Sequence, residues 1–203
     1  AEILALPSDH PRPAVPTFAG GRHEFLIPVE VVDRLRTLGE QAGATLFMTL
    51  LAGFDVLLAR YSGQDDIVIG SPIAGRTRPQ TEGLIGFFLN NLVLRCDLSG
   101  DPSFRELVAR ARETCLGAYA HQELPFEQLV DALGVARTPS RPPLFSVVID
   151  LLNTPAPPPA AAAPGTPPIL SITPLPTDTG TARYDLTLFL LEASDGIHAR
   201  LEY

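Results

Sequence analysis

The sequence predicts an α+β fold, in which a mixed β-sheet is packed by helices to form a two-layer α/β sandwich. Three observations lead to it. Apolar residues recur at helical spacing early in the chain, shorter apolar or alternating runs bounded by turn residues follow, and the last two runs pair as a hairpin. With 203 residues, of which 45% are hydrophobic and 19% charged, the chain is long enough for one sizeable domain or at most two small ones.

Two helices are predicted near the start of the chain. Pro28 suits the first turn of a helix, where its missing N–H costs nothing. The apolar residues after it recur at helical spacing: Val32, Leu35, Leu38 and Ala42. Thr45 is a good N-cap for a second helix at 46–61, which is apolar nearly all round. We therefore expect this helix to be buried on every side.

Two further helices follow in the middle of the chain. Ser103 and Glu106 form a capping box, and the helix after them is predicted to end near His121. Its inward side is expected to carry Phe104, Leu107, Ala111 and Cys115. Pro125 then begins a shorter helix that Gly134 ends.

The strands are predicted from apolar runs and alternation. They cover residues 66–73, 92–98, 144–152, 169–175, 184–192 and 197–203. Residues 144–152 are apolar on both faces and are expected to form a central strand. Asp195 and Gly196 are expected to form the hairpin turn before the last strand.

Two segments rich in proline divide the chain. Residues 1–22 read as an extended connector, because each residue before a proline is biased away from helix. Residues 154–168, almost wholly Pro, Ala, Gly and Thr, read as an exposed loop within the domain at 23–203. Since the chain starts in a connector and stops on a strand, we expect it to be part of something longer.

Composition and missing motifs exclude several functions. A formal net charge of −8 argues against a nucleic-acid partner, and no apolar run reaches the length of a membrane span. No secretory signal is evident, and Cys96 and Cys115 read as small core residues, so a reduced, cytoplasmic setting is expected. The sequence has no phosphate-binding loop, no GxSxG elbow, no CxxC pair and no HExxH metal motif, and no metal is predicted.

Several polar residues stand out, and each also has an ordinary structural explanation. The segment 70–76, GSPIAGR, is either a simple turn or a place where Arg76 reaches a carboxylate with its rigid donor fork. Asn90 precedes a patterned strand, where Asn commonly bonds its own backbone. His121 at a helix C-terminus is favoured by the helix dipole without any catalysis. From the sequence alone, Arg141 is better explained as a solvated loop charge.

Three segments in this order resemble the second half of a nonribosomal peptide synthetase condensation domain. They are IGFFLNNLVLRCDL at 85–98, HQELPFE at 121–127 and RTPSRPPL at 137–144, with a GxPxxGR segment at 70–76 before them. Two positions depart from the family pattern, since Asn91 stands where Thr is usual and Pro142 where Asn is common. The family's catalytic HHxxxDG is absent, and no two of the four His residues are adjacent.

The resemblance implies a fold and a set of site residues. A condensation domain has two lobes, each related to chloramphenicol acetyltransferase, with the active site in a tunnel between them. Residues 1–22 would then be the inter-lobe linker and 23–203 the C-terminal lobe. The residues implied to support the tunnel are Asn90, Arg76, Arg141 and Ser146. The motif residues implied to be structural are Phe88, His121, Gln122, Pro125, Phe126, Glu127 and Ser140.

The resemblance also implies an activity and partners. The family forms amide bonds between thioesters delivered by donor and acceptor peptidyl carrier proteins, on 4′-phosphopantetheine arms, beside an adenylation domain. No cofactor would bind directly, and no catalytic residue is expected in this chain, because the principal His belongs to the N-terminal lobe. The chain alone is therefore expected to be inactive. The alternative is a non-catalytic binding module that recruits carrier proteins or tailoring enzymes; a free-standing acetyltransferase lacks a catalytic base here.

Overall fold

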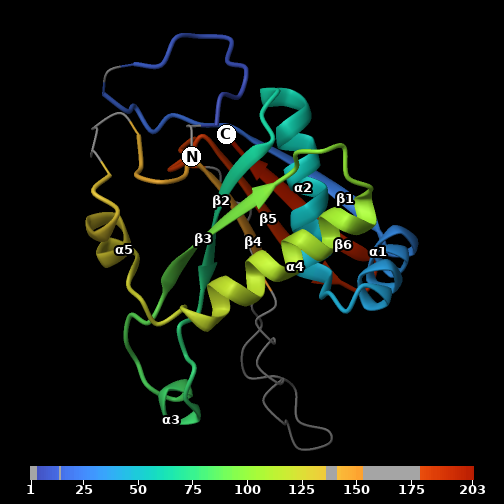
Figure 1. Ribbon diagram of the computed structural model, residues 1–203. Coiled ribbons are helices and arrows are strands. Elements are labelled where there is room, and N and C mark those ends of the chain that lie inside the picture. The colour runs from blue at the N-terminus through green and yellow to red at the C-terminus, as the bar shows by residue number, and fades with distance from the viewer. Residues whose placement is uncertain (1–3, 14, 136–140, 153–178) are drawn as a thin grey trace, which may run out of the picture.

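The computed structural model describes residues 4–13, 15–135, 141–152 and 179–203, which form a six-stranded sheet with helices (Figure 1). In chain order the elements are β1 (Arg22–Pro28), α1 (Val29–Gln41), α2 (Leu46–Ser62), β2 (Asp66–Ile73), α3 (Pro79–Glu82), β3 (Asn90–Asp97), α4 (Phe104–Ala120), α5 (Phe126–Ala132), β4 (Val147–Leu152), β5 (Leu186–Ala193) and β6 (Gly196–Glu202). The strand order is β1-β6-β5-β4-β2-β3. Strand β4 runs parallel to β2 and β5 and the other pairs are antiparallel, so the predicted mixed sheet is confirmed.

Helices α1, α2 and α4 pack on one face of this sheet, and the main core lies between the two layers (Figure 1). The most deeply buried side chains come from both layers: Leu51, Leu58, Val108 and Cys115 from the helices, and Ile67, Ile69, Leu94, Ile149, Leu190 and Ile197 from the strands. Each such apolar side chain contributes on the order of 1.5–3 kcal/mol when it leaves water. The α/β sandwich predicted from the sequence is thereby confirmed.

The predicted helix ends are confirmed by their caps. The Thr45 hydroxyl accepts the N–H of Met48 at 3.3 Å, and α2 follows it. At α4, the N–H of Ser103 donates to the Glu106 carboxylate at 2.8 Å, which completes the capping box. Helix α5 ends at Ala132, and Gly134 adopts a left-handed φ of 60° just beyond it.

Four expectations differ from the structure. Helix α2 is not buried on every side, because Leu57 and Tyr61, one turn apart, are 48% and 66% exposed. Strand β1 was not predicted. Strand β4 begins three residues later than expected, because Leu144 has a φ of 68°, which an extended strand does not accommodate. The hairpin turn is formed by residues 194 and 195 rather than 195 and 196, since Ala193 pairs with Gly196.

The structure describes most of the first proline-rich segment but not the second. Within residues 4–21, the described positions contain no helix or strand, and Ala19 makes a single bridge to Thr181. The predicted loop at 154–168 and the predicted strand at 169–175 lie outside the described residues. No single described helix is long and apolar enough to cross a membrane; α1 and α2 together have the length and composition but meet at a bend of 104°.

Candidate active-site wall and groove

The side chain of Asn90 holds the segment that leads into α5. Its amide nitrogen donates to the carbonyl oxygens of Gln122 at 2.9 Å and Leu124 at 2.8 Å. Its oxygen accepts the N–H of Phe126 at 3.0 Å. We call this set of three bonds the Asn90 clamp. Both amide hydrogens of Asn90 are used by the backbone, so this side chain joins β3 to the 122–126 segment with no N–H left for a further acceptor.

Arg76 and Phe88 close the connection between β2 and β3. The guanidinium carbon of Arg76 lies 4.2 Å from the centre of the Phe88 ring, and its Nη1 donates to the carbonyl of Thr81. Gly75 has a φ of 62°, and a Cβ there would overlap the carbonyl oxygen of Phe88. The connection therefore folds back on itself around Arg76, and a glycine is required beside it.

A groove of about 1130 Å³ lies beside α5, on the face of the sheet opposite the three main helices. Residues from four separate stretches of the described chain line it, and they come together only in the fold: 4–13 with 16–19, 126–127, 141–145 and 182–186, with Asn91 and Tyr203 at its edges. Among the sequence-predicted residues, Phe126, Glu127 and Arg141 line this groove. Asn90 sits one residue from its wall and anchors Phe126 by the clamp.

Aromatic rings form one side of the groove. The ring centres of Phe126 and Phe145 are 5.4 Å apart, and those of Phe145 and Tyr184 are 5.7 Å apart. They pack with Val68 and Val148, so this face of the sheet has a second, smaller apolar cluster. A Cβ at Gly70 would overlap the Phe145 ring, so the glycine that the sequence marked as part of a turn instead makes room for an aromatic side chain.

The groove also carries arginines in different situations. Arg12 is paired with Asp185, which ties the N-terminal segment to the start of β5. Arg183 lies over the Tyr184 ring at 5.6 Å. Arg141 is half-buried, and no hydrogen bond or ion pair joins its guanidinium to a residue of the described chain. An arginine without a partner beside an apolar surface can take an anionic group from a ligand.

The remaining predicted residues are spread around this wall. His121 is the exposed C-cap of α4, and the Gln122 side chain donates to the Tyr119 carbonyl at 3.0 Å. Pro125 is the N-cap of α5. Ser146 is 7% exposed, and its carbonyl accepts the N–H of Asp185 at 2.9 Å. Ser140 lies outside the described residues. The roles implied for these side chains stay predictions.

Sequence reasoning missed two features. Asp55 is only 2% exposed, although it lies in the middle of a core helix, and a charged residue flanked by Phe54 and Val56 was the available signal. In the connection before β3, Ile85 and Phe87 are 105% and 87% exposed, which their apolar character alone did not suggest.

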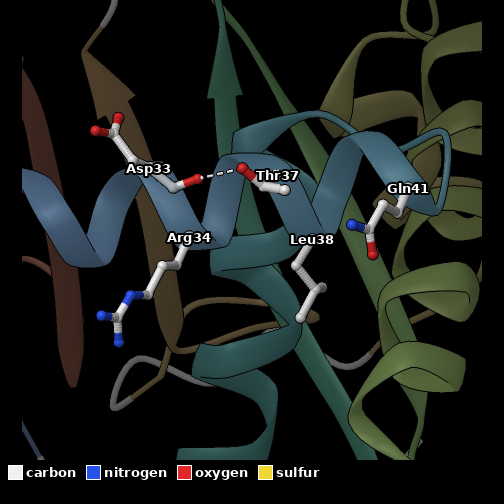
Figure 2. Close-up of a pocket in the computed structure, with 5 residues that line it drawn as sticks. All are labelled: Asp33, Arg34, Thr37, Leu38 and Gln41. Atoms are coloured by element: carbon white, nitrogen blue, oxygen red, sulfur yellow. Dashed lines mark hydrogen bonds between the residues drawn. The ribbon is translucent and has the colours of Figure 1, made fainter.

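A second, shallow depression of about 310 Å³ lies on α1. Figure 2 shows its lining residues along one side of that helix, where the Thr37 hydroxyl donates to the Asp33 carbonyl at 2.8 Å. None of the predicted site residues lines it. The described residues also contain no group of three or more His, Cys, Asp or Glu side chains placed to hold a metal ion.

Comparison with known proteins assigns the family. The model of the condensation domain matches residues 1–203, and the chain therefore belongs to the condensation domain family. It is 53% identical to a linear gramicidin synthase of Brevibacillus parabrevis, over 99% of this chain and 4% of that protein. It is 46% identical to phosphinothricin tripeptide synthetase PhsB of Streptomyces viridochromogenes, over 99% of this chain and 17% of that protein. The chain thus spans a small part of these relatives.

Solved structures agree with the fold. The X-domain from teicoplanin biosynthesis matches with a TM-score of 0.86 at 29% identity, over 100% of this chain and 46% of that chain. A four-domain nonribosomal peptide synthetase bound to AMP and glycine matches with a TM-score of 0.85 at 25% identity, over 100% of this chain and 16% of that one. Formation of peptide bonds in nonribosomal synthesis, an acyl transfer that yields an amide, is the general function of the family.

Proposed function

We propose that this chain is the C-terminal lobe of an amide-bond-forming condensation domain and supplies one wall of its active-site tunnel. The observation that carries this proposal is the fraction of each solved family domain that the chain covers. The chain matches the family over all of its residues, yet it covers only 46% of the solved X-domain and 47% of a solved condensation domain from a polyketide synthase. These shares support the presence of a second lobe in the remaining half of the domain.

The exposed apolar side chains in the connection before β3 support the idea that another lobe packs on this surface. Leu84, Ile85, Phe87 and Leu89 are all more than half exposed, and they follow one another within six residues. Contiguous apolar side chains on a surface usually mark a place where another surface packs. The N-terminal lobe of the same domain is the partner we assign to them. Substituting Ser for both Ile85 and Phe87 should then reduce self-association of the chain in sedimentation velocity; unchanged sedimentation would count against this assignment.

The chemistry explains why this chain alone should be inactive. An amine attacks a thioester only after it loses a proton, and a well-placed general base accelerates such a step by on the order of 10²–10⁴-fold. Among the described residues, His121 is an exposed helix cap, His198 is paired with Asp195 and His23 stacks on Phe25. His10 does line the groove, but it stands alone in the N-terminal segment, without the second His and the Asp-Gly of the family motif. The base is assigned to the HHxxxDG motif of the other lobe.

The groove is where we place an incoming substrate. Donor and acceptor carrier proteins would present thioesters on a phosphopantetheine arm, which is a long flexible chain with one phosphodiester. The guanidinium of Arg141, which has no hydrogen-bond or ion-pair partner among the described residues, suits that phosphate. The side chains of Phe126, Phe145 and Tyr184 suit the apolar part. An adenylation domain would supply the activated amino acids.

One experiment tests the proposal directly. The chain is mixed with donor-loaded and acceptor-loaded carrier proteins, and the intact mass of the acceptor is followed. No mass gain with this chain alone, beside turnover by a domain that contains it together with the preceding lobe, is the expected result. A gain equal to the donor acyl group, produced by this chain alone, would mean that it carries its own base and would overturn the proposal.

A recruitment module is the second candidate, and one comparison favours it. The chain matches the X-domain of teicoplanin biosynthesis in its complex with OxyB with a TM-score of 0.86 at 30% identity. The reading frame that contains this chain distinguishes the two. An intact HHxxxDG about 100–150 residues upstream, one ordinary domain away, favours catalysis, and a degraded motif favours recruitment.

A further inference from the structure

The two edge strands of the sheet, β3 and β1, differ in how they are covered. At β3, the Thr114 hydroxyl of α4 donates to the carbonyl of Arg95 at 3.3 Å. The Arg110 side chain of the same helix donates to the carbonyl of Asp97 at 2.7 Å. Helix α4 thus occupies the outer side of β3, and the Asn90 clamp holds the turn before α5 at the start of this strand. Other parts of the chain therefore keep a further strand away from this edge.

At β1, a row of backbone groups faces away from the sheet. Gly21 and Tyr203 exchange both of their backbone hydrogen bonds, at 2.7 and 3.0 Å. Because bonded pairs alternate along an antiparallel ladder, the residues of β1 that bond to β6 are His23, Phe25 and Ile27. The N–H and C=O groups of Glu24 and Leu26 therefore point outward, and no hydrogen bond joins them to another residue of the described chain.

The side chains of β1 suit the addition of a strand. Phe25 and Leu26 lie on opposite faces of the sheet and are 41% and 44% exposed. The His23 ring stacks on that of Phe25 with their centres 5.9 Å apart. An exposed, partly apolar edge strand offers main-chain bonds along its length and side-chain contacts on both faces. Pro28 ends the row, because it has no N–H and α1 begins directly after it.

The residue order of β1 fits an antiparallel second copy of the same strand. Centring the two-fold axis on Phe25 overlaps the whole of both strands, and Glu24 then exchanges backbone bonds with Leu26 of the second copy. No like charges face each other in this register. Centring the axis on Glu24 would place two carboxylates directly opposite, which is unfavourable. Centring it on His23 or Leu26 would leave one end of each strand without a partner. The charges and the length of β1 therefore select the register about Phe25.

We propose that the open edge of β1 is an interaction surface for a second copy of this chain, paired antiparallel about Phe25 so that the two sheets join. Because only β1 is an open edge, the pairing closes at a dimer and does not continue into a filament. A strand pair buries little surface, so the association is weak. The inference goes beyond the proposed function and does not depend on it. Four strands separate β1 from β3, and the apolar connection assigned to the other lobe leads into β3.

Disulfide cross-linking tests this register. Phe25→Cys is compared with Leu26→Cys, at a neighbouring and similarly exposed position, while the native Cys96 and Cys115 are buried. In the proposed dimer the two Phe25 positions face each other with about 4.5 Å between their Cα atoms. The two Leu26 positions are diagonal neighbours at about 7–8 Å, which a disulfide does not span. We expect Phe25→Cys to form the linked dimer at least about tenfold faster than Leu26→Cys, measured by non-reducing electrophoresis. Both proteins carry the double Ser substitution in the connection before β3, which removes association through that surface.

A backbone variant tests the bonds themselves. In the same double Ser background, Leu26→Pro removes an outward N–H and no bond to β6, so the fold should persist and the dimer should disappear in sedimentation velocity. Leu26→Ala keeps that N–H and should keep the dimer. Equal cross-linking rates for the two Cys variants would overturn the proposal. So would a strictly monomeric double Ser chain at the highest concentration it tolerates, or a dimer that survives Leu26→Pro. If Leu26→Pro does not fold, the ratio of the two cross-linking rates decides.

Discussion

The side-chain oxygen of Asn90 accepts the backbone N–H of Phe126 at 3.0 Å, and this bond fixes the first turn of α5 against the first residue of β3. Together with the two bonds that the Asn90 amide donates, it satisfies two carbonyl groups of the turn between α4 and α5 and the first N–H of α5. One side chain therefore determines where Phe126 enters the aromatic wall of the groove.

Asn90→Ala should lower the free energy of unfolding by about 2–3 kcal/mol, because three hydrogen bonds, two of them partly buried, are lost and each contributes on the order of 1 kcal/mol. Urea unfolding followed by circular dichroism measures it. Asn91→Ala is the matched control, since its neighbouring side chain makes no part of the clamp, and it should cost far less. Equal losses for the two variants would contradict the clamp.

Gly70→Ala should destabilise the chain by at least about 1–3 kcal/mol, because the added Cβ overlaps the Phe145 ring and the aromatic wall must shift. Gly53→Ala is the opposite case. Gly53 lies in α2 with nothing within 4 Å of an added Cβ, so alanine there should stabilise by about 0.5–1 kcal/mol through helix propensity. Thermal unfolding of both variants would show shifts of opposite sign, and a neutral Gly70→Ala would mean that Phe145 is not packed on the strand.

Arg76→Lys should loosen the connection between β2 and β3 even though the charge is kept. Lysine has neither the flat group that stacks on Phe88 nor the fork that also reaches the Thr81 carbonyl. Limited proteolysis should cut within residues 77–89 several-fold faster in this variant. Arg78→Lys, two residues away at the exposed start of α3, should leave the cutting rate unchanged. Identical rates for all three proteins would rule out a structural role for Arg76.

Ser103→Ala should cost about 1 kcal/mol through loss of the N-cap of α4. The cap also predicts an acid dependence. Hydrogen bonds from Ser103 lower the pKa of Glu106, so this contribution is present above the ordinary value of 4.5 and is lost as pH falls through the lowered value. Stability curves of the two proteins should therefore converge at low pH. Curves that stay parallel down to about pH 2 would show that Glu106 takes no part in the cap.

The sequence predicts most of the helical layer because capping residues mark where the helices begin. Thr45, Ser103 and Pro125 are local signals, and they fall where α2, α4 and α5 begin. Strand β1 lacks such a signal. Its three consecutive apolar residues run straight into Pro28, which is also the N-cap of the next helix, and its partner β6 lies at the other end of the chain.

The candidate site is only partly visible in the sequence for a related reason. The motifs identify Asn90, Phe126 and Arg141, but the clamp depends on the 122–126 segment returning beside β3, and no spacing reports that. Asp55 was overlooked because helical periodicity describes α2 as an apolar helix, and one carboxyl in it changes that pattern little. The surroundings of Asp55 include Cys96 and Cys115, which lie far from it in the sequence and come near it only through the packing.

The pairing of β1 with β6 has a consequence for how the chain is made. Arg22 lies opposite Glu202, so the edge of the sheet that is synthesised first waits for the strand that is synthesised last. At about 5–20 residues per second, the roughly 170 residues between them take on the order of ten to thirty seconds to leave the ribosome. Throughout that interval Phe25 and Leu26 have no strand to pair with, and the nascent chain offers an unpaired, apolar strand to chaperones or to a neighbouring nascent chain.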